Sequence, residues 1–184
     1  VTIKNAQFEF VTGAGQANGA FVVINKDAKV ENLVIEGCTI VGDNNKNSYG
    51  IYGQNPNATI VVKDCNFSDL GYAIQAIAGG GYKSLTVEEC TFNNIKSWAI
   101  MPLCRPYIGE LTVNKNTFTN CVGGLVKTGT FAEGHTFTFT NNEITNSAEH
   151  PAKPWFEVTA ASKVVENNMK DGQAWTPGAE QGLK

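Results

Sequence analysis

Leu111-Thr112-Val113-Asn114-Lys115-Asn116-Thr117-Phe118 is the stretch from which the fold can be predicted. Leu111 and Val113 alternate with the polar Thr112, which is typical of a β-strand with one buried face. Two polar residues then interrupt the alternation, and Asn116 and Phe118 follow. We therefore expect a strand, a bend, and a second short strand that returns Phe118 to the same interior.

The same pattern recurs along the chain: apolar, any residue, apolar, two polar residues, a small or amide residue, any residue, apolar. Strong copies begin at Leu33, Ile60, Leu85, Leu111 and Phe137, and a weaker one opens the chain at Val1. We place another weak copy through Val164, Asn167 and Met169. The sixth position falls at Ala6, Cys38, Cys65, Cys90, Asn116, Asn142 and Asn167, at intervals of 32, 27, 25, 26, 26 and 25 residues. Such regular intervals indicate a solenoid of stacked repeats.

A third apolar stretch follows in each copy, as in Tyr72-Ala73-Ile74 and Trp98-Ala99-Ile100. Three short strands in about 25 residues, with no helical stretch between copies, describe one coil of a parallel β-helix. We predict an all-β, right-handed parallel β-helix of about seven rungs that forms a single domain over residues 1–184. The expected rungs are 1–32, 33–59, 60–84, 85–110, 111–136, 137–161 and 162–170, with 171–184 as a C-terminal cap or tail.

The sixth position forms a column of thiols followed by a column of amides. Asparagines stacked at a bend can hydrogen-bond one another and the backbone, and a cysteine there acts as a small hydrophobe of similar size. A straight column of thiolates cannot surround a tetrahedral metal ion. Five cysteines leave at least one unpaired, although one disulfide between neighbouring rungs stays open. The sequence leaves the redox state undecided for Cys38, Cys65, Cys90, Cys104 and Cys121.

The charge of the chain limits its partners. Only 17% of residues are charged, the formal net charge is −3, and Arg105 is the single arginine. Nucleic acids and anionic membranes attract basic patches, so we expect neither as a partner. No apolar run reaches the roughly 18 residues of a membrane-spanning helix, so we expect no membrane insertion. Because no segment comparable to a cap precedes Val1, we expect the chain to be part of a longer protein.

The run from Leu111 to Asn120 resembles the repeat of the pectate-lyase-like superfamily of right-handed β-helices. That repeat has an apolar-x-apolar pair, an Asn at the bend, and then an aromatic or aliphatic residue. The resemblance covers roughly residues 1 to 170. The superfamily includes polysaccharide lyases, pectin-degrading hydrolases, phage tailspikes, bacterial adhesins and many gut-bacterial proteins. The resemblance implies a polysaccharide-associated bacterial protein that is extracellular or at the cell surface, but the fold alone does not decide the activity.

Lyases of this superfamily use Arg or Lys as the base and several acidic residues on adjacent rungs as Ca²⁺ ligands. Only Asp64 and Glu89 share a column on neighbouring rungs, and Lys115 follows them. This pair could be half of a calcium site. We favour a solvated column with partial charge compensation, so no cofactor is expected. The adjacent column, Glu36-Lys63-Glu88, alternates in sign as a surface ladder does.

Two segments of neighbouring rungs, 101–107 and 127–135, are expected to project as loops on one side. Together they gather Arg105, Lys127, Glu133 and His135, which are the candidates for catalysis or for binding an acidic sugar. Loops collect polar residues in any protein, so an ordinary solvated loop is the alternative. The outward column of the third strand is predicted to contain Tyr52, Gln75, Met101, Lys127 and Glu157. One acid in that column does not support hydrolase chemistry, which needs two carboxylates.

Aromatic residues offer a second possible ligand site. Tyr49, Tyr72 and Trp98 fall at comparable positions of three successive rungs, and we place Trp155 near the same column. Tyr72 and Trp98 could stack on sugar rings, but repeated aromatics are more often part of a core. Trp175 is expected to cover the C-terminal end of the solenoid.

We favour a non-catalytic carbohydrate-binding or adhesive module whose partner is a polysaccharide or a cell-surface glycan. One alternative is a fragment or minimal form of a polysaccharide lyase that acts on an acidic glycan. Arg105 or Lys127 would then be the base or the carboxylate-neutralising cation, with Glu133 or His135 assisting. The other alternative is a structural spacer of a surface protein.

Overall fold

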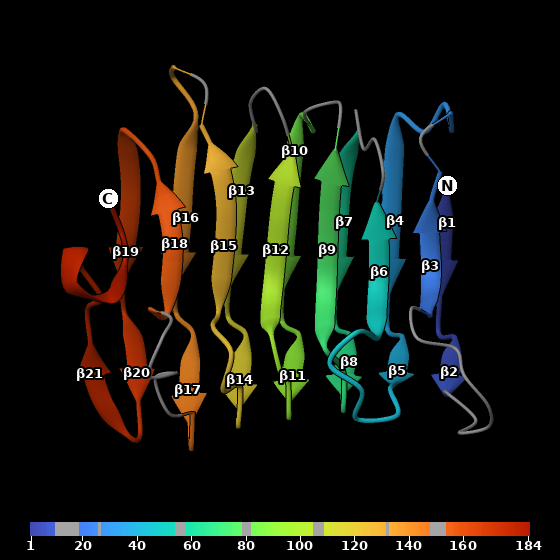
Figure 1. The fold of residues 1–184 in the computed structure, drawn as a ribbon. Coiled ribbons are helices and arrows are strands. Elements are labelled where there is room, and N and C mark those ends of the chain that lie inside the picture. Colours follow the sequence, from blue (N-terminus) through green and yellow to red (C-terminus); the bar gives the residue numbers. More distant parts are fainter. Residues whose placement is uncertain are drawn as a thin grey trace.

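The chain coils into a solenoid whose three strands per turn form three sheets (Figure 1). The structure is a computed structural model, and it describes residues 1–9, 19–25, 27–53, 58–78, 82–104, 109–131, 133–147 and 154–184. In Figure 1 the rungs follow one another in chain order from the N-terminal to the C-terminal end. All strand pairs between rungs are parallel, as the repeat predicts.

Along the chain, successive strands belong in turn to sheet A, sheet B and sheet C. Sheet A contains β1 (Thr2–Lys4), β4 (Asn32–Glu36), β7 (Thr59–Lys63), β10 (Ser84–Glu88), β13 (Glu110–Asn114), β16 (Thr136–Thr140) and β19 (Ser162–Glu166). Sheet B contains β2 (Gln7–Glu9), β5 (Thr39–Val41), β8 (Asn66–Ser68), β11 (Thr91–Asn93), β14 (Thr117–Thr119), β17 (Glu143–Thr145), β20 (Asn168–Lys170) and the antiparallel β21 (Gln173–Trp175). Sheet C contains β3 (Ala20–Ile24), β6 (Tyr49–Gly53), β9 (Tyr72–Ala78), β12 (Trp98–Cys104), β15 (Val126–Thr130) and β18 (Phe156–Thr159).

The rung count is slightly lower than predicted. Within the described ranges, six rungs contribute a strand to every sheet, and the seventh, β19 and β20, has no strand in sheet C. After β20 the chain reverses into β21 and a short 3₁₀ helix, η1 (Ala179–Gln181). Leu183 then pairs with Val158 of β18, so the C-terminal segment takes the place of the missing strand.

The predicted register of the last rung is wrong by one residue. Phe139 pairs with Val165, which leaves Val164 on the outside with 41% of its surface exposed. Asn168, and not Asn167, lies in the column of Asn142. A shift of one residue in a strand moves every side chain to the opposite face. The same shift explains why Met169 is 39% exposed.

The wrong prediction that Asn167 points inward has a conformational cause, because asparagine is suited to two adjacent positions at the bend. The residue just before the inward amide has a left-handed backbone, a conformation that Asn and Asp adopt more easily than other side chains. This corner column has φ values between 50° and 64° at Asn5, Gly37, Asp64, Glu89, Lys115, Asn141 and Asn167. An Asn-Asn pair such as Asn167-Asn168 therefore does not reveal from sequence alone which residue points inward.

The interior is largely apolar and is ordered by stacking. Phe67, Phe92 and Phe118 are buried, and their rings lie 5.2 and 4.9 Å apart with nearly parallel planes. Offset stacked aromatic pairs add about 0.5–1.5 kcal/mol beyond their buried area. Ile40 and Ile144 continue this column at its two ends. The repeat thus places one apolar side chain directly above another through the length of the core.

Buried asparagine side chains form hydrogen bonds with backbone N–H and carbonyl groups at the first bend. Asn116, Asn142 and Asn168 form the asparagine ladder, in which each side chain serves the rung before its own. Asn142 accepts from the backbone N–H of Asn116 through Oδ1 at 2.9 Å and donates through Nδ2 to the Val113 carbonyl at 3.0 Å. Buried amides without partners are costly, so this ladder stabilises the bend.

Cysteines occupy the same column in the earlier rungs, and their thiols donate hydrogen bonds to the equivalent backbone carbonyls. The Sγ atoms of Cys65 and Cys90 donate to the carbonyls of Ile35 and Val62, each at 3.6 Å. These carbonyls correspond to that of Val87, to which Asn116 donates at 2.9 Å. The thiols are therefore weak donors as well as small hydrophobes, which the sequence did not predict.

Truncation of the ladder is expected to destabilise the fold. Asn142→Ala leaves the Asn116 N–H and the Val113 carbonyl without partners, so we expect a loss of about 3 kcal/mol in the free energy of unfolding. Asn142→Cys should cost less, since a thiol can still donate to the Val113 carbonyl. Urea unfolding followed by circular dichroism measures both. The exposed Asn93→Ala is the control and should change stability by no more than about 0.5 kcal/mol.

Candidate ligand-binding face

The outer face of sheet C carries aromatic, amide, thioether and charged side chains. Its outward column is, as predicted, Tyr52, Gln75, Met101, Lys127 and Glu157. The strand register aligns these residues because Ile51, Ile74, Ile100, Val126 and Phe156 align in the core beside them.

Three tyrosines form a cluster at the N-terminal half of this face. Tyr49 stacks on Tyr72 with ring centroids 5.2 Å apart and an angle of 14°, and it meets Tyr52 at 5.2 Å with a tilt of 54°. All three side chains are half-buried. Burial raises the pKa of Tyr49, and the neighbouring Tyr72 and Tyr52 add to this. The rings are held in fixed positions and still reach solvent in part.

Gln75 lies beside this cluster and is almost fully buried. It is 5% exposed although it points outward, and its neighbours in the column are Tyr52 and Met101. Its Oε1 atom has no hydrogen-bond partner among the described residues. A buried amide oxygen without a donor costs about 1–3 kcal/mol. Such an atom is a natural acceptor for a hydroxyl group or a water molecule.

Trp98 follows Tyr72 in the next rung, but it is only 3% exposed. Its indole lies against Gly124, where a Cβ atom would come within 2.3 Å of Cζ3 of Trp98. The Nζ atom of Lys127 sits 5.5 Å from the centre of the ring, in the range of a cation–π contact. Trp98 therefore has little free ring face for stacking on a sugar, whereas Tyr72 retains some.

Trp155 does not share the column of Trp98. Its carbonyl accepts hydrogen bonds from Leu125 and Val126, and Phe156 pairs with Val126, so Trp155 lies one position further along. It is buried and meets Trp175 at 5.9 Å. Trp175 also stacks on Phe156 at 6.1 Å, which places it against the C-terminal end of the core.

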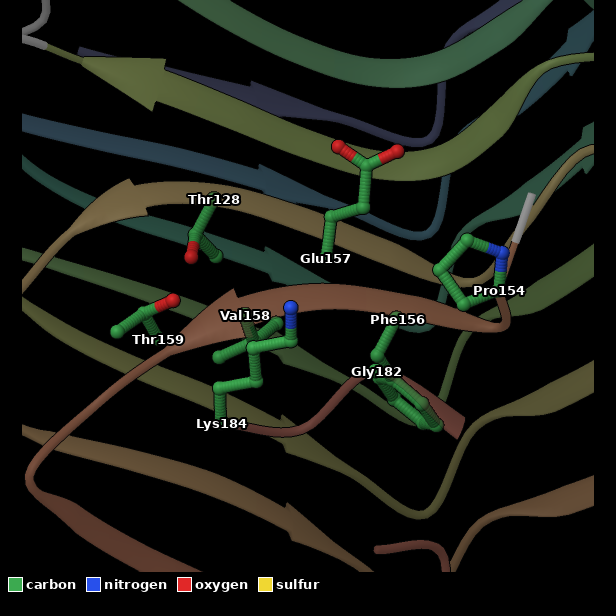
Figure 2. A pocket seen from close by; sticks show the side chains of 8 residues that line it. All are labelled: Thr128, Pro154, Phe156, Glu157, Val158, Thr159, Gly182 and Lys184. Atoms are coloured by element: carbon green, nitrogen blue, oxygen red, sulfur yellow. The ribbon is translucent and has the colours of Figure 1, made fainter. Parts of the chain in front are cut away.

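Lys127 and Glu157 form an ion pair of 2.5 Å on the C-terminal half of the face. Next to it lies a concavity of about 450 Å³ between β15, β18 and the C-terminal segment (Figure 2). It is lined by Thr128, Pro154, Phe156, Glu157, Val158, Thr159, Gly182 and Lys184. No sequence signal pointed to this hollow, because it depends on the return of residues 182–184 beside β18.

The loop cluster predicted from Arg105, Lys127, Glu133 and His135 is not reproduced by the described residues. Arg105 lies outside them. Lys127 belongs to β15 rather than to a projecting loop, and its partners are Glu157 and Trp98. His135 contacts Glu110 at 3.3 Å, and the exposed Glu133 has no ion pair within the described ranges. Residues 127–130 belong to β15, which pairs with β18 with a register shift between Lys127 and Thr130.

The acidic pair Asp64 and Glu89 lies in the left-handed corner column. Glu89 is ion-paired with Lys63 at 3.4 Å and with Lys115 at 3.6 Å, and the pKa of Lys63 is raised chiefly by its hydrogen bond to Glu89. Lys63 also pairs with Glu88 at 3.7 Å. Over the described residues, no group of three or more His, Cys, Asp or Glu side chains is suited to a metal ion. Calcium binding at Asp64 and Glu89 stays an untested prediction.

Comparison with known proteins supports the class that the geometry defines. A model of the right-handed β-helix region matches residues 1–170, and the chain therefore belongs to the right-handed β-helix family. The parallel solenoid is consistent with the pectate-lyase-like superfamily. Comparisons with curated proteins and with solved structures gave no match. The described ranges contain no helix with the length and hydrophobicity that crossing a bilayer requires.

The position of Trp98 can be tested through the glycine beneath it. Gly124→Ala should lower the free energy of unfolding by more than about 2 kcal/mol, because its φ of 145° is unfavourable for alanine and its Cβ would collide with the indole. Gly134→Ala is the matched control: its φ is 82° and no atom lies within 4 Å, so we expect a loss of only about 1 kcal/mol. Urea unfolding compares the two variants, and equal losses would contradict the close contact.

Proposed function

We propose that the protein is a non-catalytic carbohydrate-binding module that holds a glycan on the outer face of sheet C. The observation that carries this proposal is the cluster of Tyr49, Tyr52 and Tyr72 beside the buried, unpartnered oxygen of Gln75. Aromatic rings offer flat apolar surfaces with a polar edge, which suits the mixed apolar and hydroxyl surface of a sugar ring. Gln75 would accept a hydrogen bond from a sugar hydroxyl after a shift of its side chain, because its Oε1 atom is buried in the structure.

The charges of this face favour a neutral glycan. The outward column contains one acid and one base, Glu157 and Lys127, and they are already joined in an ion pair. Binding an acidic sugar at Lys127 would require breaking that pair and moving the ammonium group away from Trp98. The same engagement of Lys127 does not favour the role of a lyase base, which must be free to take a proton. A neutral polysaccharide of a cell surface is the partner we propose, with the protein outside the cell.

A glycan array of neutral and acidic polysaccharides, run with and without Ca²⁺, is the direct test. We expect binding to neutral glycans that does not depend on Ca²⁺. Tyr72→Ala should weaken the affinity about tenfold, equivalent to about 1.4 kcal/mol, because it removes one ring of the cluster. Tyr72→Phe keeps the ring and should bind nearly as well as the unchanged protein.

Thr112→Ala, on the outer face of sheet A, is the control and should leave binding unchanged. Circular dichroism of each variant checks that the β-helix persists. Absence of binding across the array, or equal binding by Tyr72→Ala, would overturn the proposed role of the tyrosines. Release of unsaturated sugars from an acidic polymer would instead support the lyase.

A further inference from the structure

We propose that Lys163 prevents a second copy of this chain from pairing with the C-terminal edge of sheet A. This inference does not depend on glycan binding. It rests on the different ways in which the three sheets end at β18, β19 and β20. An exposed strand edge is a template for pairing with another chain, and proteins protect such edges in several recognisable ways.

Two of the three sheets are covered at this end. In sheet B, β20 pairs with the antiparallel β21, which has only three residues and is soon followed by Pro177. In sheet C, the Gly182 carbonyl accepts from the Val158 N–H at 3.2 Å, and the Lys184 N–H donates to the Val158 carbonyl at 2.8 Å. Short strands, proline and covering segments all protect an edge. These two sheets therefore offer little free backbone to a further strand.

Sheet A ends differently. β19 pairs with β16 on one side, and in the part of the chain that the structure describes no strand pairs with its other side. Four of its five residues are exposed. Val164, on its outer face, leaves 41% of its surface in solvent. β19 is therefore the free edge at the C-terminal end of the solenoid.

Lys163 occupies a position that belongs to the core in the earlier rungs. It pairs with Phe137, and the buried members of this column are Leu33, Ile60, Leu85, Leu111 and Phe137. The strand Ser162-Lys163-Val164-Val165-Glu166 also matches the interior strand Ser84-Leu85-Thr86-Val87-Glu88 at three of its five positions. On the core-facing side, the difference between this edge strand and the interior strand is lysine in place of leucine.

The ammonium group of Lys163 stays at the surface. The residue is exposed, and its Nζ atom donates to the Ala160 carbonyl at 2.6 Å. Over the described residues, none of the ion pairs involves Lys163. A lysine can cover apolar neighbours with its methylene groups while its charge remains in water. This arrangement suits the end of a core, but between two rungs it would place an unpaired charge in an apolar column.

A strand added to β19 would bury that charge. It would lie about 4.8 Å away, and its inward side chains would cover Lys163. Burial of an ammonium group without a carboxylate partner is strongly unfavourable. A second copy is the partner to be excluded, because its own sheet A ends in two unpaired strands, β1 and β19. Neither brings an acid to the core side, since their inward residues are Ile3, Lys163 and Val165.

The test is light scattering coupled to size-exclusion chromatography, in which the unchanged protein and Lys163→Leu are compared over a series of concentrations. The variant has at this position the residue of β10, so we expect its average mass to rise with concentration to about twice that of the unchanged protein or more. Association through the N-terminal end would be common to both proteins, so the difference between them is what is measured. Equal masses at every concentration would overturn the inference.

Two further lysine variants are matched controls. Lys163→Arg keeps the positive charge and should have the mass of the unchanged protein. Lys83→Leu removes an exposed lysine and adds a leucine just before β10, away from the edge, and it should not associate either. Association of either control to the same extent as Lys163→Leu would contradict the role of a charge at this edge.

Hydrogen–deuterium exchange distinguishes edge pairing from aggregation of a misfolded variant. In associated Lys163→Leu, the amides of β19 should exchange more slowly than in the unchanged protein, because N–H groups of the free edge acquire partners. The amides of the interior strand β10 should exchange as before. Association with unchanged exchange in β19, or with faster exchange in β10, would overturn the inference.

Discussion

The in-register pairing of each strand with its counterpart one rung away is the constraint on which this structure depends. A parallel ladder places like positions above one another, so any side chain that suits one rung must also suit contact with its copy. Phe67, Phe92 and Phe118 meet this condition through stacking, and Asn116 meets it by donating its side-chain amide to Oδ1 of Asn142. No single rung could bury these groups, and their stability comes from repetition.

The first bend shows that two different chemistries can occupy one column. Thiols and amides donate to equivalent backbone carbonyls, but only the amide also offers a strong acceptor to the neighbouring N–H. The amide half of the column is thus held by paired hydrogen bonds, and the thiol half is held mainly by packing.

The outer face of sheet C differs in composition from the outer faces of sheets A and B. The described outer faces of sheets A and B carry threonines and other short polar side chains, outward valines such as Val34 and Val61, and paired charges such as Lys63 with Glu88. Sheet C departs from this pattern with tyrosines, a buried glutamine and one isolated ion pair. Its strands β9 and β12 are also the longest of the solenoid. The proposed glycan site lies where the repeat is least uniform.

The sequence by itself determined the parallel β-helix, the columns of the core and the outward column from Tyr52 to Glu157, because alternation and a constant interval are properties of the chain. Only the tertiary structure decided that Asn168 rather than Asn167 points inward, that Trp98 is covered, and that Lys127 pairs with Glu157 instead of joining His135. The concavity beside Lys184 is likewise a feature that only the tertiary structure reveals. These features depend on the backbone conformation at each corner and on the return of the C-terminal segment. Both arise from contacts between residues far apart in sequence, which no local pattern contains.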